Sequence, residues 1–327
     1  MQQRPLGSTG FTVSRLALGT MTWGRDTDEH EARDQLAAFV EAGGTLVDTA
    51  DVYADGESER VLGLLLADVV ARDDIVLATK AVSRPGSERR FDASRGHLLR
   101  ALDDSLRRLG VDHVDLWQLH AWDPLTPLDE TLAAADQAVS AGKVRYLGVS
   151  NYNGWQTAQA ATWQRALSGR TPVVASQVEY SLLQRGVERE VVPAASALGL
   201  GLLAWSPLGR GVLTGKYRTG TPADSRAASP HFTSFVQPYL GEQSRQVVEA
   251  VVTAATGLGV APLEVALAWV RDRPGVTSAV VGARTAAQLR GSLAAEDVDL
   301  PDEITQALDE VSAPLLSYPE HGWNQRG

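Results

Sequence analysis

Four polar side chains end or directly follow short apolar runs, and their types suit proton transfer at a carbonyl group. Asp48 ends one run, Lys80 follows a second and His120 follows a third, while Tyr53 lies in the loop after Asp48. In a barrel of alternating parallel strands and helices, catalytic groups lie at the carboxyl ends of the strands. We therefore expect these four side chains to meet at one rim of such a barrel.

Together the four residue types form a general acid with an electrophilic partner. A phenol has an ordinary pKa of about 10, but a nearby ammonium stabilises the phenolate. We expect Lys80 to lower the pKa of Tyr53, and Asp48 to keep the buried Lys80 charged. His120 could then donate a hydrogen bond to a carbonyl oxygen and orient it. Such a site neutralises the alkoxide that forms when hydride adds to a carbonyl.

Each residue alone also has an ordinary structural interpretation. A lysine at a strand end is commonly a solvated charge, and a single tyrosine or histidine commonly packs or hydrogen bonds in the core. A further alternative makes Lys80 a nucleophile that forms a Schiff base. The carboxylate of Asp48 disfavours this chemistry, because a Schiff-base amine must be neutral.

Three segments resemble the catalytic signatures of the aldo-keto reductase superfamily: Asp48-Thr49-Ala50-Asp51-Val52-Tyr53, Thr79-Lys80 and Gln118-Leu119-His120. The resemblance spans nearly the whole chain. It implies reduction of an aldehyde, ketone or sugar carbonyl with NADPH, Tyr53 being the general acid/base that Asp48 and Lys80 tune and His120 orienting the carbonyl. The alternative is a regulatory protein of the same fold that senses NADPH for a partner. Channel β subunits of this fold typically carry asparagine at the His120 position, so histidine favours a reductase.

The elements that must position these residues follow from the apolar runs, nearly all of which are continuous. Continuous runs of this length fit strands buried on both faces, as in parallel sheets. Helical patterns lie between them, which favours a parallel α/β architecture. Eight runs suffice to close a (β/α)8 TIM barrel within one domain, residues 1–327. The runs are 15–19, 46–48, 75–79, 114–119, 146–149, 173–177, 201–204 and 278–281.

Two helical patterns have clear ends. One runs from Asp92 to Leu109 with leucines along one face, and Gly110 ends it. The other runs from Thr27 to Ala42. At its start, Asp26 followed three residues later by Glu29 predicts a capping box.

Three segments fall outside the strand and helix alternation. Residues 1–14 contain turn-forming glycines between short apolar pieces, which predicts a hairpin that seals the bottom of the barrel. Residues 206–241 form a connection much longer than usual, so we expect a functional loop at the cofactor and substrate site. The tail, residues 313–327, is expected either to fold over the barrel mouth with Tyr318 and Trp323 or to be a loosely attached end.

Several residues resemble the family's contacts with the nicotinamide and the pyrophosphate. Amide and hydroxyl side chains suit the nicotinamide carboxamide, and an aromatic side chain, Tyr180 or Trp205, could stack on the ring. Glycines in the segment 205–217 allow the backbone to approach phosphates, and Lys216 adds a positive charge. The same segment lacks the third glycine of a Rossmann fingerprint. The remaining predicted contacts are Ser150, Asn151, Gln177, Ser206, Pro207, Leu208 and Gly211.

Other residues resemble the family's contacts with the adenosine half. Arg226 matches an arginine used around the adenosine phosphate. The segment 281–285 lies at an expected helix N-terminus, where anions bind favourably, and Arg284 offers donors for a 2′-phosphate, which favours NADPH over NADH. Gly291 and Ser292 stand where the family usually has an acidic residue and an asparagine. The predicted contacts of this end are Gly282, Arg284, Gln288 and Ser292.

Aromatic residues are the main candidates for substrate contacts. We expect Trp23 and Trp122 to line the substrate site, because an aromatic wall suits aryl carbonyls or sugar rings; ordinary core and surface aromatics are the alternative. Further candidates are Asp123, Phe232, Phe235 and Tyr239.

The composition argues against other function classes. Thirty Lys and Arg against 40 Asp and Glu give a net charge of −10 without a basic block, so nucleic acid is not an expected partner. Cysteine is absent and the six histidines are scattered, which suggests neither a disulfide framework nor a metal site. The N-terminus lacks the apolar core of a signal peptide, and no run approaches the ~20 apolar residues of a membrane span. We expect a cytoplasmic protein; the natural carbonyl, the direction of reaction and the oligomeric state stay open.

Overall fold

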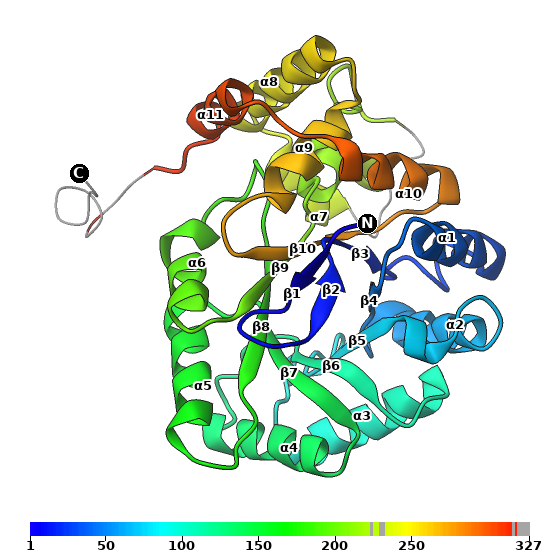
Figure 1. Cartoon of the computed structure of the whole chain (residues 1–327), viewed down its shortest axis with the longest axis vertical. Helices are drawn as coiled ribbons and strands as arrows, with labels where there is room; N and C mark the ends of the chain where they lie inside the picture. The colour runs from blue at the N-terminus through cyan, green and yellow to red at the C-terminus, as the bar shows by residue number, and fades with distance from the viewer. Residues whose placement is uncertain (223–224, 229–232, 316–317, 319–327) are drawn as a thin grey trace.

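Eight parallel strands close into a barrel, as the apolar runs predict (Figure 1). The computed structural model describes residues 1–222, 225–228, 233–315 and 318. Around the barrel the strands follow the order β10-β3-β4-β5-β6-β7-β8-β9, so that chain neighbours are also spatial neighbours and β10 closes on β3. The strands are β3 Leu16–Gly19, β4 Leu46–Asp48, β5 Val76–Ala81, β6 Val114–Leu119, β7 Val144–Ser150, β8 Val173–Glu179, β9 Gly201–Trp205 and β10 Val276–Val281.

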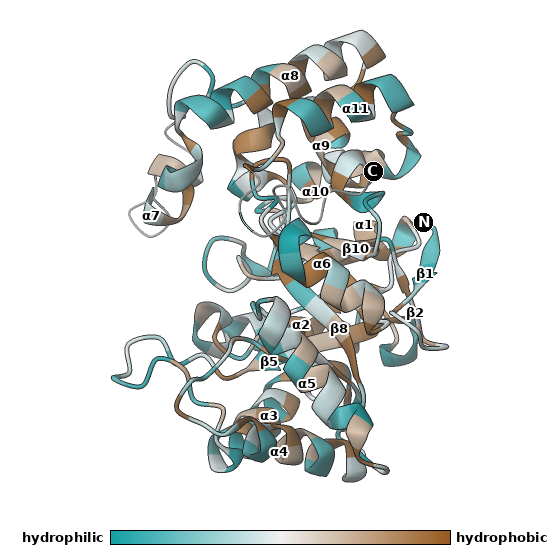
Figure 2. Ribbon diagram, turned by 90° about the vertical axis from the view of Figure 1, so that its left-hand side faces the viewer, coloured by the Kyte–Doolittle hydropathy of each residue, from teal (hydrophilic) through white to brown (hydrophobic). Residues whose placement is uncertain are grey.

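Helices cover the outside of the barrel, and one large apolar core lies between them and the strands. Figure 2 shows that α8, α9, α10 and α11 gather at one side of the molecule. Of the described helices, α8 and α9 together have the length and composition of a membrane span but meet at a bend of 102°, and neither passes that test alone. The helices are α1 Glu29–Glu41, α2 Glu57–Leu66, α3 Arg95–Leu109, α4 Leu128–Ser140, α5 Gly154–Ala166, α6 Val187–Ala197, α7 Thr233–Val236, α8 Glu242–Leu258, α9 Pro262–Arg271, α10 Ala286–Leu293 and α11 Asp302–Val311.

The helix ends agree only partly with the sequence patterns. Gly110 ends α3 with φ of 66°, as expected, although the helix begins at Arg95 and not at Asp92. The predicted cap of α1 is wrong: Asp28 is the N-cap, and its carboxylate accepts from the backbone N–H of Glu31 at 2.9 Å. Asp26 lies in the preceding turn and pairs with Arg25, so it is not available to cap the helix.

The N-terminal hairpin closes the bottom of the barrel, as predicted. It consists of β1 Gln3–Pro5 and β2 Thr12–Ser14. Leu6 and Val13 are fully buried in a second apolar cluster with residues from the barrel strands. At the tip, Gly7 has φ of 60°, and a Cβ atom there would lie 2.5 Å from the carbonyl oxygen of Gly199. Only glycine therefore permits this close approach.

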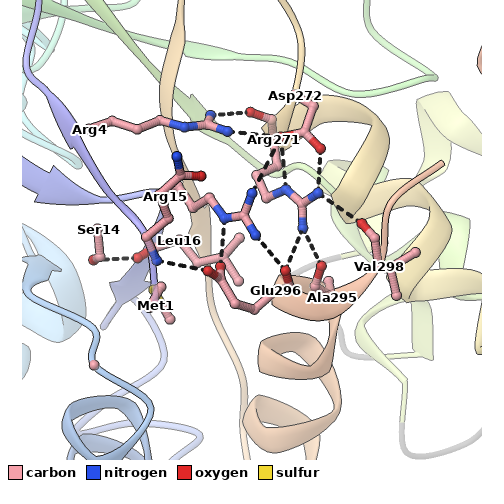
Figure 3. A network of polar contacts seen from close by, with 12 residues as sticks. Met1, Arg4, Ser14, Arg15, Leu16, Arg271, Asp272, Ala295, Glu296 and Val298 are labelled. Carbon is pink, nitrogen blue, oxygen red and sulfur yellow. Dashed lines mark hydrogen bonds and ion pairs between the residues drawn. The ribbon is translucent and has the colours of Figure 1, made fainter.

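A buried arginine joins the end of α9 to the segment after α10 (Figure 3). Arg271 is fully buried and donates hydrogen bonds to the carbonyl oxygens of Ala295, Glu296 and Val298. Its Nε also donates to Asp272 at 3.0 Å. Arg15 extends the network by donating from Nε to Glu296 at 2.9 Å. The guanidinium is thus the point at which several chain segments near the N-terminal hairpin are held together.

The connection after β9 contains little regular structure, as its composition predicts. Its described parts form short helical turns at Gly209–Thr214, Arg226–Ala228 and Gln237–Tyr239, with α7 before the last of them. Residues 223–224 and 229–232 lie outside the described part of the chain, as do 316–317 and 319–327. The predictions for Phe232, for the Arg226 side chain and for most of the tail therefore concern residues or side chains that the structure does not describe.

Candidate active site

The structure brings Asp48, Tyr53, Lys80 and His120 together at the carboxyl ends of β4, β5 and β6 and the turn after β4. Lys80 lies within β5 and not after it; its ammonium donates to Asp48 Oδ2 at 2.5 Å and to the Tyr53 hydroxyl at 3.4 Å. The rings of Tyr53 and His120 lie 6.0 Å apart at an interplanar angle of 79°. Adjacent strands place the groups side by side because β4 pairs with β5 and β5 pairs with β6.

Asp48 is held by amide side chains from two further strands. Gln118 of β6 donates to Asp48 Oδ1 at 3.1 Å, and Gln177 of β8 donates to the same atom at 2.9 Å. With Oδ2 facing Lys80, both carboxylate oxygens are engaged. Burial of an ionised carboxylate is costly unless it is paired and hydrogen bonded, and these contacts meet that need. Gln118 has no predicted role in the Gln118-Leu119-His120 motif; its place two residues before His120 was the available signal.

The buried ion pair keeps Lys80 cationic. Burial by itself would lower the pKa of Lys80, but the charge of Asp48, with a further contribution from Tyr53, outweighs it and raises the pKa above its ordinary value. Lys80 is fully buried and also donates to the carbonyl oxygen of Thr49 at 2.8 Å. This result agrees with the expected role of Asp48.

For Tyr53 the net direction differs from the expectation. Burial raises the pKa of the phenol above its ordinary value of 10, and the Lys80 ammonium offsets only part of that increase. The phenol is consequently protonated at neutral pH. In this state it can donate a proton but does not release one to bulk water.

His120 is a neutral imidazole. Burial, with the nearby Lys80 charge, lowers its pKa to about 3. Its Nδ1 atom is buried without a hydrogen-bond partner among the described residues. A neutral imidazole has one N–H donor and one acceptor nitrogen, so His120 can donate to an oxygen without adding charge to the site.

A cavity of about 540 Å³ opens from the Tyr53 and His120 side chains and extends to the start of α10. Most of the predicted cofactor residues line it. They come from the ends of β7 and β8, from the connection after β9 and from the β10 to α10 segment. These residues are Ser150, Asn151, Gln177, Trp205, Ser206, Pro207, Leu208, Gly211, Lys216, Gly282, Arg284, Gln288 and Ser292.

The side chains within the cavity are positioned by one another. Asn151 donates to the carbonyl oxygen of His120 at 2.9 Å and accepts from the Trp205 indole at 3.1 Å. At the other end, Thr285 caps α10 by accepting from the backbone N–H of Gln288, and the Gln288 side chain accepts from the Arg284 N–H at 3.0 Å. The cavity therefore carries polar groups at both ends, with the cations Lys216 and Arg284 on its wall.

Several predicted contacts lie elsewhere. Tyr180 is buried against Trp269, and its hydroxyl donates to Glu188 at 2.6 Å. Of the two aromatic candidates for the nicotinamide ring, Trp205 lines the cavity and Tyr180 does not. The predicted substrate residue Trp23 is a core residue: it is fully buried, and its indole donates to Gln35.

The other candidates for substrate contacts have partners within the protein. Trp122 packs edge to face against Tyr152 and Trp155 and does not line the cavity. Asp123 is buried and accepts from Arg89, and Tyr239 donates to Glu179. Aromatic and acidic residues at strand ends serve packing as readily as binding, which is why residue type did not separate these cases.

Phe235 and Arg210 also line the cavity and pack against each other. Phe235 lines the cavity, as the sequence analysis proposed, and its ring lies parallel to that of Trp205 with centroids 6.5 Å apart. Arg210, to which no role was given, also lines the cavity, and its guanidinium lies 3.9 Å from the centroid of the Phe235 ring. Its position between two glycines was the signal available in the sequence, and its φ of 59° shows that the loop is tightly turned there. Among the described residues no cluster of His, Asp and Glu could hold a metal ion.

The fold and site define a parallel (β/α)8 barrel with a buried lysine and carboxylate beside a phenol, at the carboxyl ends of the strands. The chain belongs to the aldo/keto reductase family, whose model matches residues 15–313. It is 38% identical over 326 residues to the uncharacterized oxidoreductase YrpG of Bacillus subtilis, an alignment that covers 95% of this chain and 96% of that protein. It is 35% identical over 324 residues to a probable voltage-gated potassium channel subunit beta of Oryza sativa, with 98% of each chain covered. Aldo-keto reductase YhdN of Bacillus subtilis is 33% identical over 325 residues.

Proposed function

We propose that the protein is an NADPH-dependent reductase that converts an aldehyde, ketone or sugar carbonyl to an alcohol, with Tyr53 as general acid. The observation that carries the proposal is the contact of the Tyr53 hydroxyl with the cationic Lys80 on the wall of a large cavity. Proton donation to a developing alkoxide needs a protonated acid whose conjugate base is stabilised, and this pair supplies both.

The four residues then have separate roles. Tyr53 donates its proton to the alkoxide oxygen, and Lys80 stabilises the phenolate that is left. Asp48 keeps Lys80 charged and in place through the contact of 2.5 Å. The neutral His120 donates a hydrogen bond to the carbonyl oxygen and so orients it. Because Lys80 stays cationic, the alternative in which it attacks a carbonyl as a free amine is disfavoured.

The residues of the cavity fit a nicotinamide dinucleotide. When bound, the reduced cofactor supplies the hydride for the carbonyl carbon. Ser150, Asn151 and Gln177 offer hydroxyl and amide groups for the carboxamide, and Trp205 offers an aromatic face for the ring. The positively charged Lys216 and Arg284 line the same cavity and suit phosphate groups. The guanidinium of Arg284 suits a phosphate on the ribose, which NADPH carries and NADH lacks. We therefore assign NADPH as the cofactor.

The rice relative, a probable channel subunit by its name, raises a second candidate. In that case the chain would bind NADPH and regulate a partner without steady catalysis. The protonated Tyr53 and the neutral His120 favour a reductase, because a protein that only senses the cofactor does not require a proton donor at the carbonyl position.

Turnover separates the two candidates. The full chain is mixed with NADPH and, in separate reactions, with aliphatic aldehydes, aryl ketones and aldoses, and the loss of reduced cofactor is followed by absorbance. We expect many turnovers per protein molecule with at least one class. Tight binding of NADPH without turnover across the panel would contradict the reductase and support the regulatory protein.

A further inference from the structure

Asp51 is a partly buried acidic residue that the proposed reaction does not use. It lies two residues before Tyr53, and its backbone N–H donates to the carbonyl oxygen of Lys80 at 3.2 Å. Its Oδ1 atom is buried and has no hydrogen-bond partner among the described residues. A buried carboxyl oxygen in this position needs a reason, because burying an unpaired charge is costly.

The groups around Asp51 come from three neighbouring elements. Glu59 of α2 is fully buried; it accepts from the Thr79 hydroxyl at 2.5 Å and from Arg108 Nε of α3 at 2.7 Å. Lys80 of β5 is already bound to Asp48. Both nearby cations therefore have a carboxylate partner before Asp51 is considered.

This arrangement disfavours the charged form of Asp51. Burial, with the negative charge of Glu59, raises its pKa from 3.8 to about 7. The charges of Arg108 and Lys80 and the N–H of Val52 act in the opposite direction but are weaker. The Asp51 carboxyl therefore gains and loses a proton close to neutral pH.

The turn that carries Tyr53 is in contact with the same cluster. Three consecutive residues, Ala54, Asp55 and Gly56, have φ of 48°, 56° and 90°. A Cβ atom on Gly56 would lie 2.9 Å from Cδ of Arg108, so the turn lies directly against the arginine that binds Glu59. The turn that carries Tyr53 and the charged residues around Asp51 thus share a direct packing contact.

We propose that Asp51 is a positioning residue: protonation of its unpartnered carboxyl, which lies between the Glu59–Arg108 pair and the turn that carries Tyr53, sets how readily Tyr53 gives up its proton. The proposal rests on the proposed function, since it concerns the same proton donor. The ionised carboxylate of Asp51 raises the pKa of Tyr53, so the phenol is a weaker acid when Asp51 is charged. Neutral Asp51 removes this effect, and proton donation becomes easier.

The first test is the pH profile of carbonyl reduction in the wild type and in Asp51→Asn. The wild-type kcat should fall by roughly threefold as the pH rises through neutrality, while the variant should keep its value from acid pH. Asp55→Asn is the matched control: it removes the same charge from the same turn, but Asp55 is exposed, and asparagine tolerates its left-handed backbone. A variant profile that keeps the wild-type inflection would overturn the proposal.

The second test needs no catalysis. The free energy of unfolding is measured with urea for the wild type, Asp51→Asn and Asp51→Ser between about pH 4 and about pH 8. Because the folded-state pKa of Asp51 is raised, its contribution to stability is present at acid pH and is lost as the pH rises toward 7. The wild type should therefore lose stability relative to both variants over this range.

The two measurements distinguish the two proposals. A stability difference that is constant with pH would show that Asp51 does not titrate, whatever the protein catalyses. Absence of carbonyl reduction together with the expected pH-dependent stability difference would overturn the reductase and the coupling to Tyr53, while leaving the proton exchange at Asp51 in place.

Discussion

The guanidinium of Arg210 pairs with both carboxylate oxygens of Glu179, at 2.8 and 2.7 Å. Arg210 belongs to the connection after β9, and Glu179 is the last residue of β8. The Tyr239 hydroxyl donates to the same carboxylate at 3.1 Å, and the Arg210 guanidinium lies over the Phe235 ring. One carboxylate at the barrel rim thus holds two separate parts of the long connection that lines the cavity.

Replacing Glu179 should loosen residues 233–240. In Glu179→Ala, Arg210 and Tyr239 lose their common partner, so backbone amides of this segment should exchange hydrogen with solvent faster. Mass-spectrometric hydrogen exchange measures this by peptide. Glu249→Ala is the matched control, since Glu249 lies on α8 and its replacement breaks an exposed pair with Arg218. Equal exchange of residues 233–240 in the wild type and Glu179→Ala would show that the carboxylate is not what holds the segment.

Removing the Tyr53 hydroxyl should abolish reduction and spare cofactor binding. In Tyr53→Phe the site has no proton donor, so we expect kcat to fall by about 10²- to 10⁴-fold. The dissociation constant of NADPH, measured by fluorescence, should change little. Tyr146→Phe is the control, because Tyr146 stacks on Phe11 of the hairpin at the opposite end of the barrel. Substantial turnover by Tyr53→Phe would mean that another group donates the proton.

Arg284 should distinguish the two nicotinamide dinucleotides. Loss of charge-assisted hydrogen bonds to a 2′-phosphate in Arg284→Ala should weaken NADPH by roughly tenfold or more and NADH much less. Titration of both cofactors by isothermal calorimetry measures the difference. Arg290→Ala removes an exposed arginine from α10 outside the cavity and should leave both affinities unchanged. Equal losses for the two cofactors in Arg284→Ala would place the 2′-phosphate elsewhere.

Arg271 should matter for stability and not for chemistry. Its removal in Arg271→Ala leaves the buried carbonyl oxygen of Ala295 and the partly buried one of Val298 without their donor. We expect the free energy of unfolding to fall by about 3–5 kcal/mol, measured with urea. Arg107→Ala, which breaks an exposed pair with Asp104, should cost less than about 1 kcal/mol. The idea fails if the two variants are equally stable.

The barrel and the meeting of the four polar residues could be predicted because both follow from order along the chain. Each apolar run is a strand buried on both faces, and parallel strands joined by helices point their carboxyl ends the same way. Polar residues at the ends of such runs, such as Asp48 and His120, therefore lie at the same rim of the barrel. The hairpin of residues 1–14 and the irregular connection 206–241 could also be predicted from the sequence, because glycine and proline determine the backbone conformation at their own positions.

The tertiary structure decided what depends on distance and on solvent. No pattern in the sequence states that Gln118 and Gln177 share one oxygen of Asp48, or that Glu179 binds Arg210, because these partners are brought together only by closure of the barrel. The direction of the Tyr53 pKa shift and the burial of Tyr180 against Trp269 were also decided by the tertiary structure. Both depend on how completely water is removed from a ring, and packing by residues remote in the chain determines that.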